Sequence, residues 1–276
     1  MTPEGMGDHP DLRGRAVCFR DFVGRRRFLY DDSGHGTHVC GILCGSGRLS
    51  GGRLRGMAPG VRLVLGKVLD RNGDGSTEAM LEGLDWVLEL REEYGIRIVN
   101  ISVGIGSLRE RRKEDLLQER IERLWRKGIL VVCAAGNKGP REGSISAVGG
   151  KCVVTVGCYD GSFAVGNPRS CELYSGRGFA GSPVRKPDLV APGTDILSCG
   201  LMSRGGQDRG AGPYVAKSGT SMATPIVAGA AALAFQTYPG MTNEECKRRL
   251  QFSATDLGLP WNRQGWGLLN VGRLLD

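Results

Sequence analysis

The sequence lacks any apolar run close to the roughly 20 residues that a membrane-spanning helix needs, and its first residues lack the basic and apolar regions of a signal peptide. We therefore expect neither a membrane segment nor a secretion leader. Aromatic residues are also few, at 6% of the 276 residues, whereas 45 residues are glycine. Many tight turns with few large side chains are typical of a compact α/β enzyme. No internal repeat or linker divides the chain, so we expect one domain.

Cysteine pairs with CxxC spacing are also missing, although the chain has nine cysteines. An odd number without close pairs argues against a disulfide framework and against a structural zinc site. Cys40, Cys44 and Cys133 lie in apolar runs, where a free thiol packs as a small hydrophobic group. This use of cysteine favours a reducing, cytoplasmic location.

A long, purely basic stretch is absent despite the formal net charge of +8. In residues 109–127 the basic side chains alternate with acidic ones, and Leu117, Ile121 and Leu124 recur at helical spacing. The charges therefore indicate the solvated face of an amphipathic helix. The three arginines at 25–27 form only a short cluster, which we interpret as a surface loop. We expect no nucleic-acid partner.

Short, mainly apolar segments alternate with helical patterns along the chain. The clearest of these segments cover residues 62–69, 96–102, 129–135 and 152–158. Strands of this kind, separated by helices, are buried on both faces. The pattern predicts an α/β fold with a doubly wound, mostly parallel sheet and helices on both faces. In such folds the loops at the carboxyl ends of the strands carry the chemistry.

Ser221 lies among small residues just before the apolar run at 226–235, which predicts a buried helix that begins near Pro225. The N-terminus of a helix carries positive partial charge and free N–H groups, so an anion that formed beside Ser221 would be stabilised there. A serine before a helix is most often an N-cap. The interpretation as a nucleophile needs a base and an oxyanion donor elsewhere in the chain.

Two other positions could supply these groups. His35 stands at a helix start after a polar turn, and together with His38 it could bind a metal, but no HExxH glutamate accompanies the pair. A role as a base or orienting group therefore fits His35 better than zinc binding does. Asn137 follows an apolar strand that ends at Gly136. It is either a turn residue or an amide donor to an oxyanion.

Three motifs occur in a fixed order: HGTHVCG around His35, AAGN ending at Asn137, and SGTSMATP around Ser221, with KPDLVAPG between the last two. This pattern resembles the subtilisin-like serine peptidases, and especially their intracellular bacterial branch, over nearly the whole chain. An α/β-hydrolase would instead need its serine in G-x-S-x-G. The resemblance implies a subtilisin-like peptidase domain over residues 1–276, acting in the cytoplasm as a serine endopeptidase on protein or peptide substrates.

The resemblance also implies roles for individual residues. Ser221 would be the nucleophile that forms an acyl-enzyme, His35 the general base and then acid, and Asn137 the oxyanion donor. Substrate would lie as an extended strand between two edges, which correspond to Ser102, Val103, Gly104 and to Gly73, Asp74, Gly75. The first specificity pocket would be lined by Ala134, Ala135 and Gly136.

One departure from the family pattern concerns the catalytic aspartate. The family carries it at the end of an N-terminal strand shortly before HPDL, and laying that motif on this chain places Pro3 at the aspartate position. The strand itself is missing, so we expect a domain that is truncated at its N-terminus. The alternative function is a catalytically impaired or inactive subtilase domain that acts as a peptide-binding module, or a gene fragment.

A second departure concerns calcium. Many secreted relatives carry a metal-binding loop after the histidine helix, but here residues 45–56 contain no carboxylate and no asparagine. The segment DRNGDG at 70–75 resembles the start of a calcium loop, yet Leu81 stands where the bidentate glutamate would be. We expect a turn at 70–75, no tight calcium site at 45–56, no other metal and no cofactor.

Overall fold

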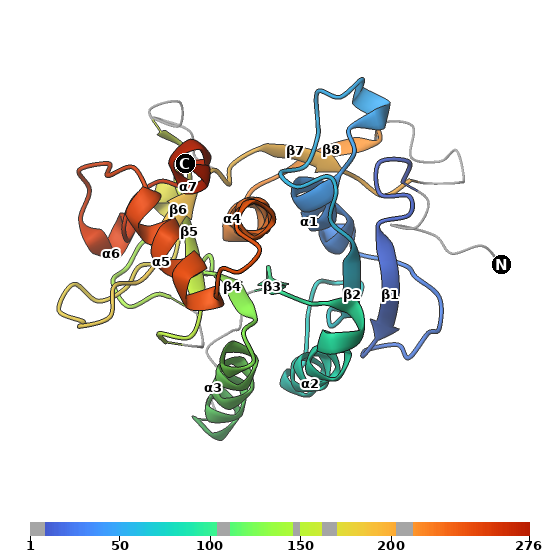
Figure 1. Ribbon diagram of the computed structural model, residues 1–276, viewed down its shortest axis with the longest axis horizontal. Coiled ribbons are helices and arrows are strands. Elements are labelled where there is room, and N and C mark those ends of the chain that lie inside the picture. The colour runs from blue at the N-terminus through green and yellow to red at the C-terminus, as the bar shows by residue number, and fades with distance from the viewer. Residues whose placement is uncertain (1–8, 104–110, 146–149, 162–169, 203–211) are drawn as a thin grey trace. The chain divides into compact units, whose positions relative to one another are not determined.

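The computed structural model describes residues 9–103, 111–145, 150–161, 170–202 and 212–276. The chain forms two compact units (Figure 1). The first unit comprises residues 1–96 and 197–216, and the second comprises residues 97–196 and 217–276. Within the described residues, no helix is both long and apolar enough to cross a membrane.

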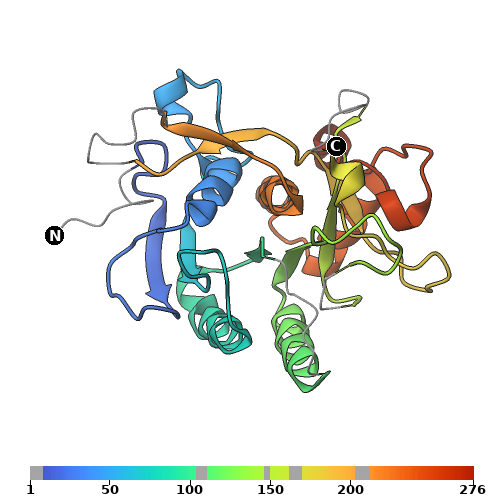
Figure 2. The ribbon, with the colours of Figure 1, turned by 180° about the vertical axis from the view of Figure 1, so that it is seen from behind.

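The first unit is built around a pair of parallel strands, β1 (Ala16–Asp21) and β2 (Leu63–Lys67). Helix α1 (His35–Cys44) and the short helix η2 (Arg48–Ser50) lie between them in the chain, and α2 (Thr77–Tyr94) follows β2. The strands β7 (Ile196–Cys199) and β8 (Tyr214–Lys217) pair with each other and lie beside α1 (Figures 1 and 2). Gly41 permits this approach, because a Cβ there would lie only 2.3 Å from Ser198 Oγ.

Helix α2 begins directly after Ser76. Ser76 caps it, since its Oγ accepts a hydrogen bond from Ala79 N at 3.0 Å. The buried face of the helix carries Trp86, whose ring meets that of Phe22 edge-on with 5.7 Å between centroids. The helix is therefore fastened to the end of β1 by aromatic packing.

The second unit contains a four-stranded parallel sheet. Its strands β3 (Ile98–Ile101), β4 (Leu130–Ala134), β5 (Val154–Cys158) and β6 (Leu189–Ala191) are hydrogen-bonded in that order. All residues of β4, β5 and β6 are buried, which explains why these segments are mainly apolar and carry no charged side chain. Helix α4 (Thr220–Thr237) contacts all four strands, and α5 (Asn243–Ser253) lies on the opposite side of the sheet (Figures 1 and 2). The predicted parallel α/β class is confirmed.

The amphipathic helix predicted near residues 109–127 is α3 (Arg111–Arg126). Leu117, Ile121 and Leu124 are at most 1% exposed, so the apolar stripe is the buried face. Helix α5 opens with a capping box of Thr242 and Glu245. The short elements η4 (Cys171–Leu173), α6 (Trp261–Gln264) and α7 (Val271–Leu275) complete the unit.

Helix α4 begins earlier than the sequence analysis predicts. We expected its start near Pro225, but it begins at Thr220, so that Ser221 is the second residue inside the helix and Pro225 the sixth. Gly219 sets the start, with a φ of 152° that favours glycine. Proline has no N–H to donate to the carbonyl four residues earlier, which here is that of Ser221. The helix tolerates this loss close to its N-terminus.

Cys158 and Cys171 form a disulfide bond, which the cysteine spacing did not predict. Their Cα atoms are 5.4 Å apart, within the usual range for bridged cysteines. The other cysteines are free thiols. Burial raises the pKa of Cys44 and of Cys133 to about 12, which keeps these thiols protonated and unreactive. The expectation that thiols in apolar runs act as packing groups is confirmed for these two.

Candidate functional site

Ser221 lies in the first turn of α4, in the second unit. Thr220 N donates to Asn137 Oδ1 at 3.0 Å, and Met222 N donates to Gly219 O at 2.9 Å. Among the described residues, no acceptor binds the Ser221 N–H. This N–H therefore stays available at the positive end of a long helix, beside the half-buried Ser221 hydroxyl.

Asn137 is held next to this helix start by Thr220. Its Oδ1 accepts from Thr220 N and from Thr220 Oγ1, each at 3.0 Å. Because a backbone N–H can only donate, the atom that faces it is the amide oxygen, and the other end of the amide is the Nδ2 donor. A Cβ on Gly219 would lie 3.2 Å from that Nδ2. The structure thus brings Asn137 and Ser221 to one helix N-terminus.

Thr220 is a contributor that the sequence analysis missed. Besides binding Asn137, its Oγ1 accepts from Gly136 N at 3.2 Å. One threonine therefore ties the end of β4 to the start of α4. Its place directly before Ser221 is the signal that could have revealed it, because a hydroxyl at a helix start satisfies neighbouring backbone groups.

Ala134, Ala135 and Gly136 lie at the carboxyl end of β4 and are all buried. Ala135 N donates to Val156 O at 2.9 Å, and Gly136 accepts from Gly176 N at 2.9 Å. A Cβ on Gly176 would lie 2.4 Å from Ala135 O, so only glycine fits against this strand end. The three predicted pocket residues are thereby fixed by backbone contacts.

The two substrate edges predicted from the resemblance lie in different units. Ser102 follows β3 in the second unit, is buried, and accepts a hydrogen bond from Asn100 Nδ2 at 2.9 Å. Val103 is half-buried, and Gly104 lies outside the described residues. Gly73, Asp74 and Gly75 lie in the first unit, at the exposed tip of the predicted turn. Asp70 Oδ1 closes that turn by accepting from Asn72 N and Asp74 N.

His35 is the first residue of α1, in the first unit, and is half-buried. The backbone N–H of His35 donates to Ser33 Oγ at 3.2 Å. Asp31 fixes the same helix start: its Oδ1 accepts from Gly34 N at 2.9 Å, and its Oδ2 accepts from Thr37 N and Thr37 Oγ1 at 2.7 Å. The backbone that carries the imidazole is therefore anchored by one carboxylate.

The charge state of Asp31 follows from these contacts. Burial on its own raises the pKa of this carboxyl, but the hydrogen bonds from Thr37, Ser33 and Gly34 outweigh it and lower the pKa below its ordinary value. Asp31 thus stays ionised at neutral pH. A negative charge at the N-terminus of α1 also interacts favourably with the helix dipole.

Replacing Asp31 with alanine should lower the free energy of unfolding by about 1 to 2 kcal/mol, because several N–H groups at the start of α1 lose their acceptor. Since the pKa of Asp31 is lowered on folding, its contribution is present above the unfolded pKa of about 4 and is lost as pH falls through the folded value. Urea unfolding at neutral and acidic pH measures both effects.

The neighbouring acid provides the control for this prediction. Asp32 pairs with Lys67 Nζ at 2.6 Å, and its side chain is 35% exposed. The change Asp32→Ala should lower the free energy of unfolding by less than about 1 kcal/mol, as is usual for a partly exposed ion pair. A larger cost for Asp32→Ala than for Asp31→Ala would contradict the capping role.

His38, the second histidine of the HGTHVCG motif, has a structural role. His38 is buried, and its Nε2 lies 3.0 Å from Val215 O. Ser198 Oγ donates to His38 O at 2.9 Å. These contacts join α1 to the β7–β8 pair within the first unit, and they support the choice of His35 over a zinc-binding histidine pair.

Two groups of possible metal ligands occur among the described residues: His9, Asp11 and Cys199, and Cys158, Asp160 and Cys171. In the first group, His9 Nε2 lies 2.8 Å from Pro213 O, and Asp11 accepts from Leu49 N and Tyr214 Oη. In the second, the two cysteines are joined as a disulfide. Hydrogen bonds therefore engage His9 and Asp11, and a covalent bond engages Cys158 and Cys171.

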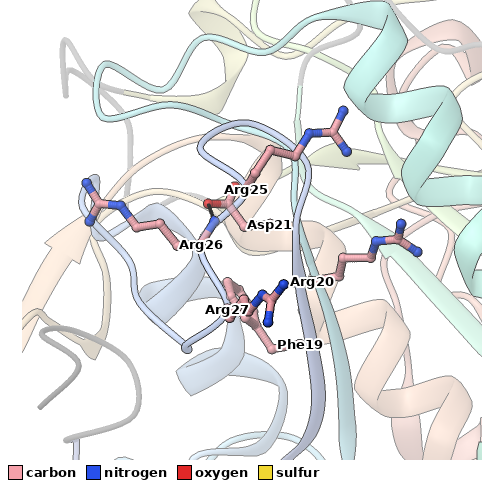
Figure 3. Close-up of a pocket in the computed structure, with 6 residues that line it drawn as sticks. All are labelled: Phe19, Arg20, Asp21, Arg25, Arg26 and Arg27. Carbon is pink, nitrogen blue, oxygen red and sulfur yellow. Dashed lines mark hydrogen bonds between the residues drawn. The ribbon is translucent and has the colours of Figure 1, made fainter.

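The arginine cluster borders a pocket at the end of β1 (Figure 3). Two of its arginines have local partners: Arg25 forms a 2.8 Å ion pair with Glu82, and Arg26 lies over the Tyr30 ring at 4.5 Å. Asp21 accepts from Arg26 N at 3.0 Å and so closes the loop. Figure 3 shows the Arg20, Arg25 and Arg26 side chains pointing in different directions. The arrangement is that of a surface loop.

Comparison with known proteins places these observations in context. Residues 5–267 match the model of the subtilase family, Peptidase S8. The serine protease AprX of Bacillus subtilis (strain 168) is 38% identical over an alignment of 264 residues, and the match covers 91% of this chain and 59% of the relative. A thermostable alkaline protease of Halalkalibacterium halodurans is 35% identical over 269 residues, covering 98% of this chain and 64% of that protein.

Solved structures support the same relationship. The structure of sphericase matches with a TM-score of 0.79 and 26% identity, covering 96% of this chain and 87% of that one. This match confirms the predicted α/β fold. The chain spans only 59% and 64% of the lengths of the two relatives described above.

Proposed function

Because the chain belongs to the subtilase family of serine peptidases, we propose that it is a serine endopeptidase whose nucleophile is Ser221. The observation that carries this proposal is the arrangement at the start of α4. Asn137 is anchored through its oxygen, which leaves Nδ2 as a donor, and the Ser221 N–H has no acceptor among the described residues. Two donors beside one hydroxyl are what acyl transfer from a peptide requires.

In the proposed reaction, Ser221 Oγ attacks the carbonyl carbon of the scissile peptide bond while His35 takes the hydroxyl proton. The carbonyl oxygen becomes an oxyanion that accepts hydrogen bonds from Asn137 Nδ2 and Ser221 N. His35 then gives the proton to the leaving amine, and the acyl group stays on Ser221. Water, deprotonated by His35, releases the acyl group and restores the serine.

The substrate is proposed to bind as an extended strand. Its first edge would be Ser102, Val103 and Gly104, and its second edge Gly73, Asp74 and Gly75, with backbone groups supplying main-chain hydrogen bonds. Ala134, Ala135 and Gly136 would line the first specificity pocket. The exposure of the turn at 73–75 and the small residues at the end of β4 support this assignment.

A single peptidase domain, a cytoplasmic location and membership of the intracellular bacterial branch also belong to the proposal. The location is supported by the free cysteines, which are unusual in proteins of oxidising compartments. The disulfide between Cys158 and Cys171 is the observation that weighs against it.

A fluorophosphonate probe tests the proposed nucleophile. The folded chain should form one adduct, which mass spectrometry of its peptides should place on Ser221. The control is protein unfolded in urea, which should not react because an ordinary serine hydroxyl is a weak nucleophile. Absence of an adduct even at alkaline pH, where imidazole is neutral, would overturn the proposal.

The second candidate function is a catalytically impaired subtilase domain that binds peptides. It is favoured by Pro3, which stands at the register of the family's catalytic aspartate; residues 1–8 lie outside the described part of the chain. A chain that binds an extended peptide but neither cleaves it nor reacts with the probe would have this function.

A further inference from the structure

The turn that follows β6 holds the backbone just before Ser221. Gly193 O accepts from Gly219 N at 2.8 Å. Two residues further along, Asp195 N donates to Ser218 Oγ at 2.8 Å. Gly219 in turn accepts from Met222 N in the first turn of α4. The position of the Ser221 backbone is therefore set by where residues 193–195 lie.

Asp160 holds this turn from the end of β5. Its Oδ1 accepts from Thr194 N at 3.1 Å and from Gly193 N at 3.4 Å. Its Oδ2 accepts from Thr194 Oγ1 and, at 2.9 Å, from Cys171 N. One carboxylate thus binds three groups of the turn and one group of the disulfide loop. Hydrogen bonds to an ionised carboxylate are stronger than those between neutral groups, so this carboxylate suits the positioning of a backbone turn.

The disulfide bond and Tyr174 close the space behind the turn. A Cβ on Gly193 would lie 2.6 Å from Cys158 Sγ and 2.8 Å from Gly219 O, so Gly193 is packed between the disulfide and the backbone before Ser221. The hydroxyl of Tyr174 lies 3.1 Å from Thr194 Oγ1. Each of these contacts limits movement of the turn away from Gly219.

From this chain of contacts we propose that Asp160 is a positioning residue for Ser221. The proposal rests on the proposed peptidase function for its catalytic consequence. Asp160 acts without touching substrate. It holds Gly193 in position, Gly193 positions Gly219, and Gly219 positions both the Ser221 hydroxyl and the neighbouring N–H donor. Loss of the carboxylate displaces the reacting groups, and a displacement of about 1 Å can cost on the order of 10² in rate.

The test compares Asp160→Ala and Asp160→Asn with the wild-type chain. Fluorophosphonate labelling of Ser221 should slow by about 10- to 100-fold in Asp160→Ala. With a peptide substrate, kcat should fall while KM changes little. Asp160→Asn keeps one oxygen that can accept from the Gly193 and Thr194 N–H groups, so it should recover part of the rate.

A matched control distinguishes positioning from general stability. Asp256, in the same unit, also binds backbone and side-chain donors, namely Gly258 N at 3.0 Å and Gln264 Nε2 at 2.8 Å. In Asp256→Ala, the fluorophosphonate probe should label Ser221 at the wild-type rate. This should hold even if the urea midpoint of unfolding falls as far as it does in Asp160→Ala. Equal slowing in both variants would overturn the proposal.

Hydrogen exchange provides a readout that does not depend on catalysis. The Gly219 amide should exchange faster in Asp160→Ala than in the wild type, whereas amides in α5 should not change. If the wild type does not react with the probe but Gly219 still exchanges faster in the variant, the peptidase proposal fails and the positioning role stands. If Gly219 exchanges equally in both, the positioning role is wrong.

Discussion

Replacing Asn137 with leucine should lower the rate of peptide hydrolysis by about 10² to 10³, the loss known from a subtilisin in which one oxyanion donor is removed. The physical reason is the loss of Nδ2 as a donor beside the start of α4. Leucine is close to asparagine in size, so the end of β4 should keep its packing. Steady-state kinetics should show the effect in kcat, because the hydrogen bond forms with the oxyanion and not with the ground-state carbonyl.

Two further variants separate donation by Asn137 from anchoring by Thr220. Asn137→Asp keeps an oxygen for Thr220 N and Thr220 Oγ1 but has no N–H donor, so its kcat should be as low as that of the leucine variant. Thr220→Val removes one of the two hydrogen bonds to Asn137 Oδ1 and leaves the backbone bond. It should therefore lower kcat by less than tenfold, because one hydrogen bond contributes about 1 kcal/mol and tenfold corresponds to about 1.4 kcal/mol. An Asn137→Asp variant with near wild-type kcat would contradict the role as donor.

The sequence predicts most of the sheet because burial and strand pattern coincide there. The segments that become β4 and β5 are mainly apolar and uncharged, and in the structure they are buried along their whole length. Burial on both faces leaves no polar alternation, so the pattern is unambiguous. The start of α4 was predicted wrongly because Pro225 suggested a first turn, whereas the backbone freedom of Gly219 decides where the helix begins.

The sequence predicts the residues that we propose to react, but not the groups that hold them in place. His35, Asn137 and Ser221 lie in motifs, but no pattern in the sequence shows which groups bind to them. Thr220 binds Asn137 across 83 positions, and Asp160 binds Thr194 across 34. Such long-range hydrogen bonds depend on which strand ends become neighbours in the fold. The pairing of Cys158 with Cys171 escaped prediction for the same reason.

We expect the largest loss of stability from a single substitution at Asp188, in the Lys186-Pro187-Asp188 segment. Asp188 is 2% exposed and lies between two cations, with Lys186 Nζ at 2.6 Å and Lys247 Nζ at 3.1 Å. It also accepts from Thr155 N at 2.8 Å and Gln251 Nε2 at 3.0 Å. Asp188→Ala should lower the free energy of unfolding by about 3 to 5 kcal/mol, because it leaves buried ammonium groups without their carboxylate.

Urea unfolding of the wild type and Asp188→Ala measures this loss, and Arg248→Ala serves as the control. Arg248 forms an exposed pair with Glu244 at 3.7 Å, so its removal should change stability by less than about 0.5 kcal/mol. A cost for Asp188→Ala no larger than that of Arg248→Ala would show that the buried pair contributes nothing.

Acidification should reduce the difference between the wild type and Asp188→Ala. Burial alone raises the pKa of Asp188, but the charges of Lys186 and Lys247 outweigh it and hold the pKa below its ordinary value. A carboxyl whose pKa is lowered on folding contributes stability above its unfolded pKa, about 4, and loses it as pH falls through the folded pKa. The stability difference should therefore be constant near neutral pH and shrink below about pH 4. A difference that grew on acidification would mean that Asp188 is protonated in the folded chain, which would contradict its role as the anion between the two lysines.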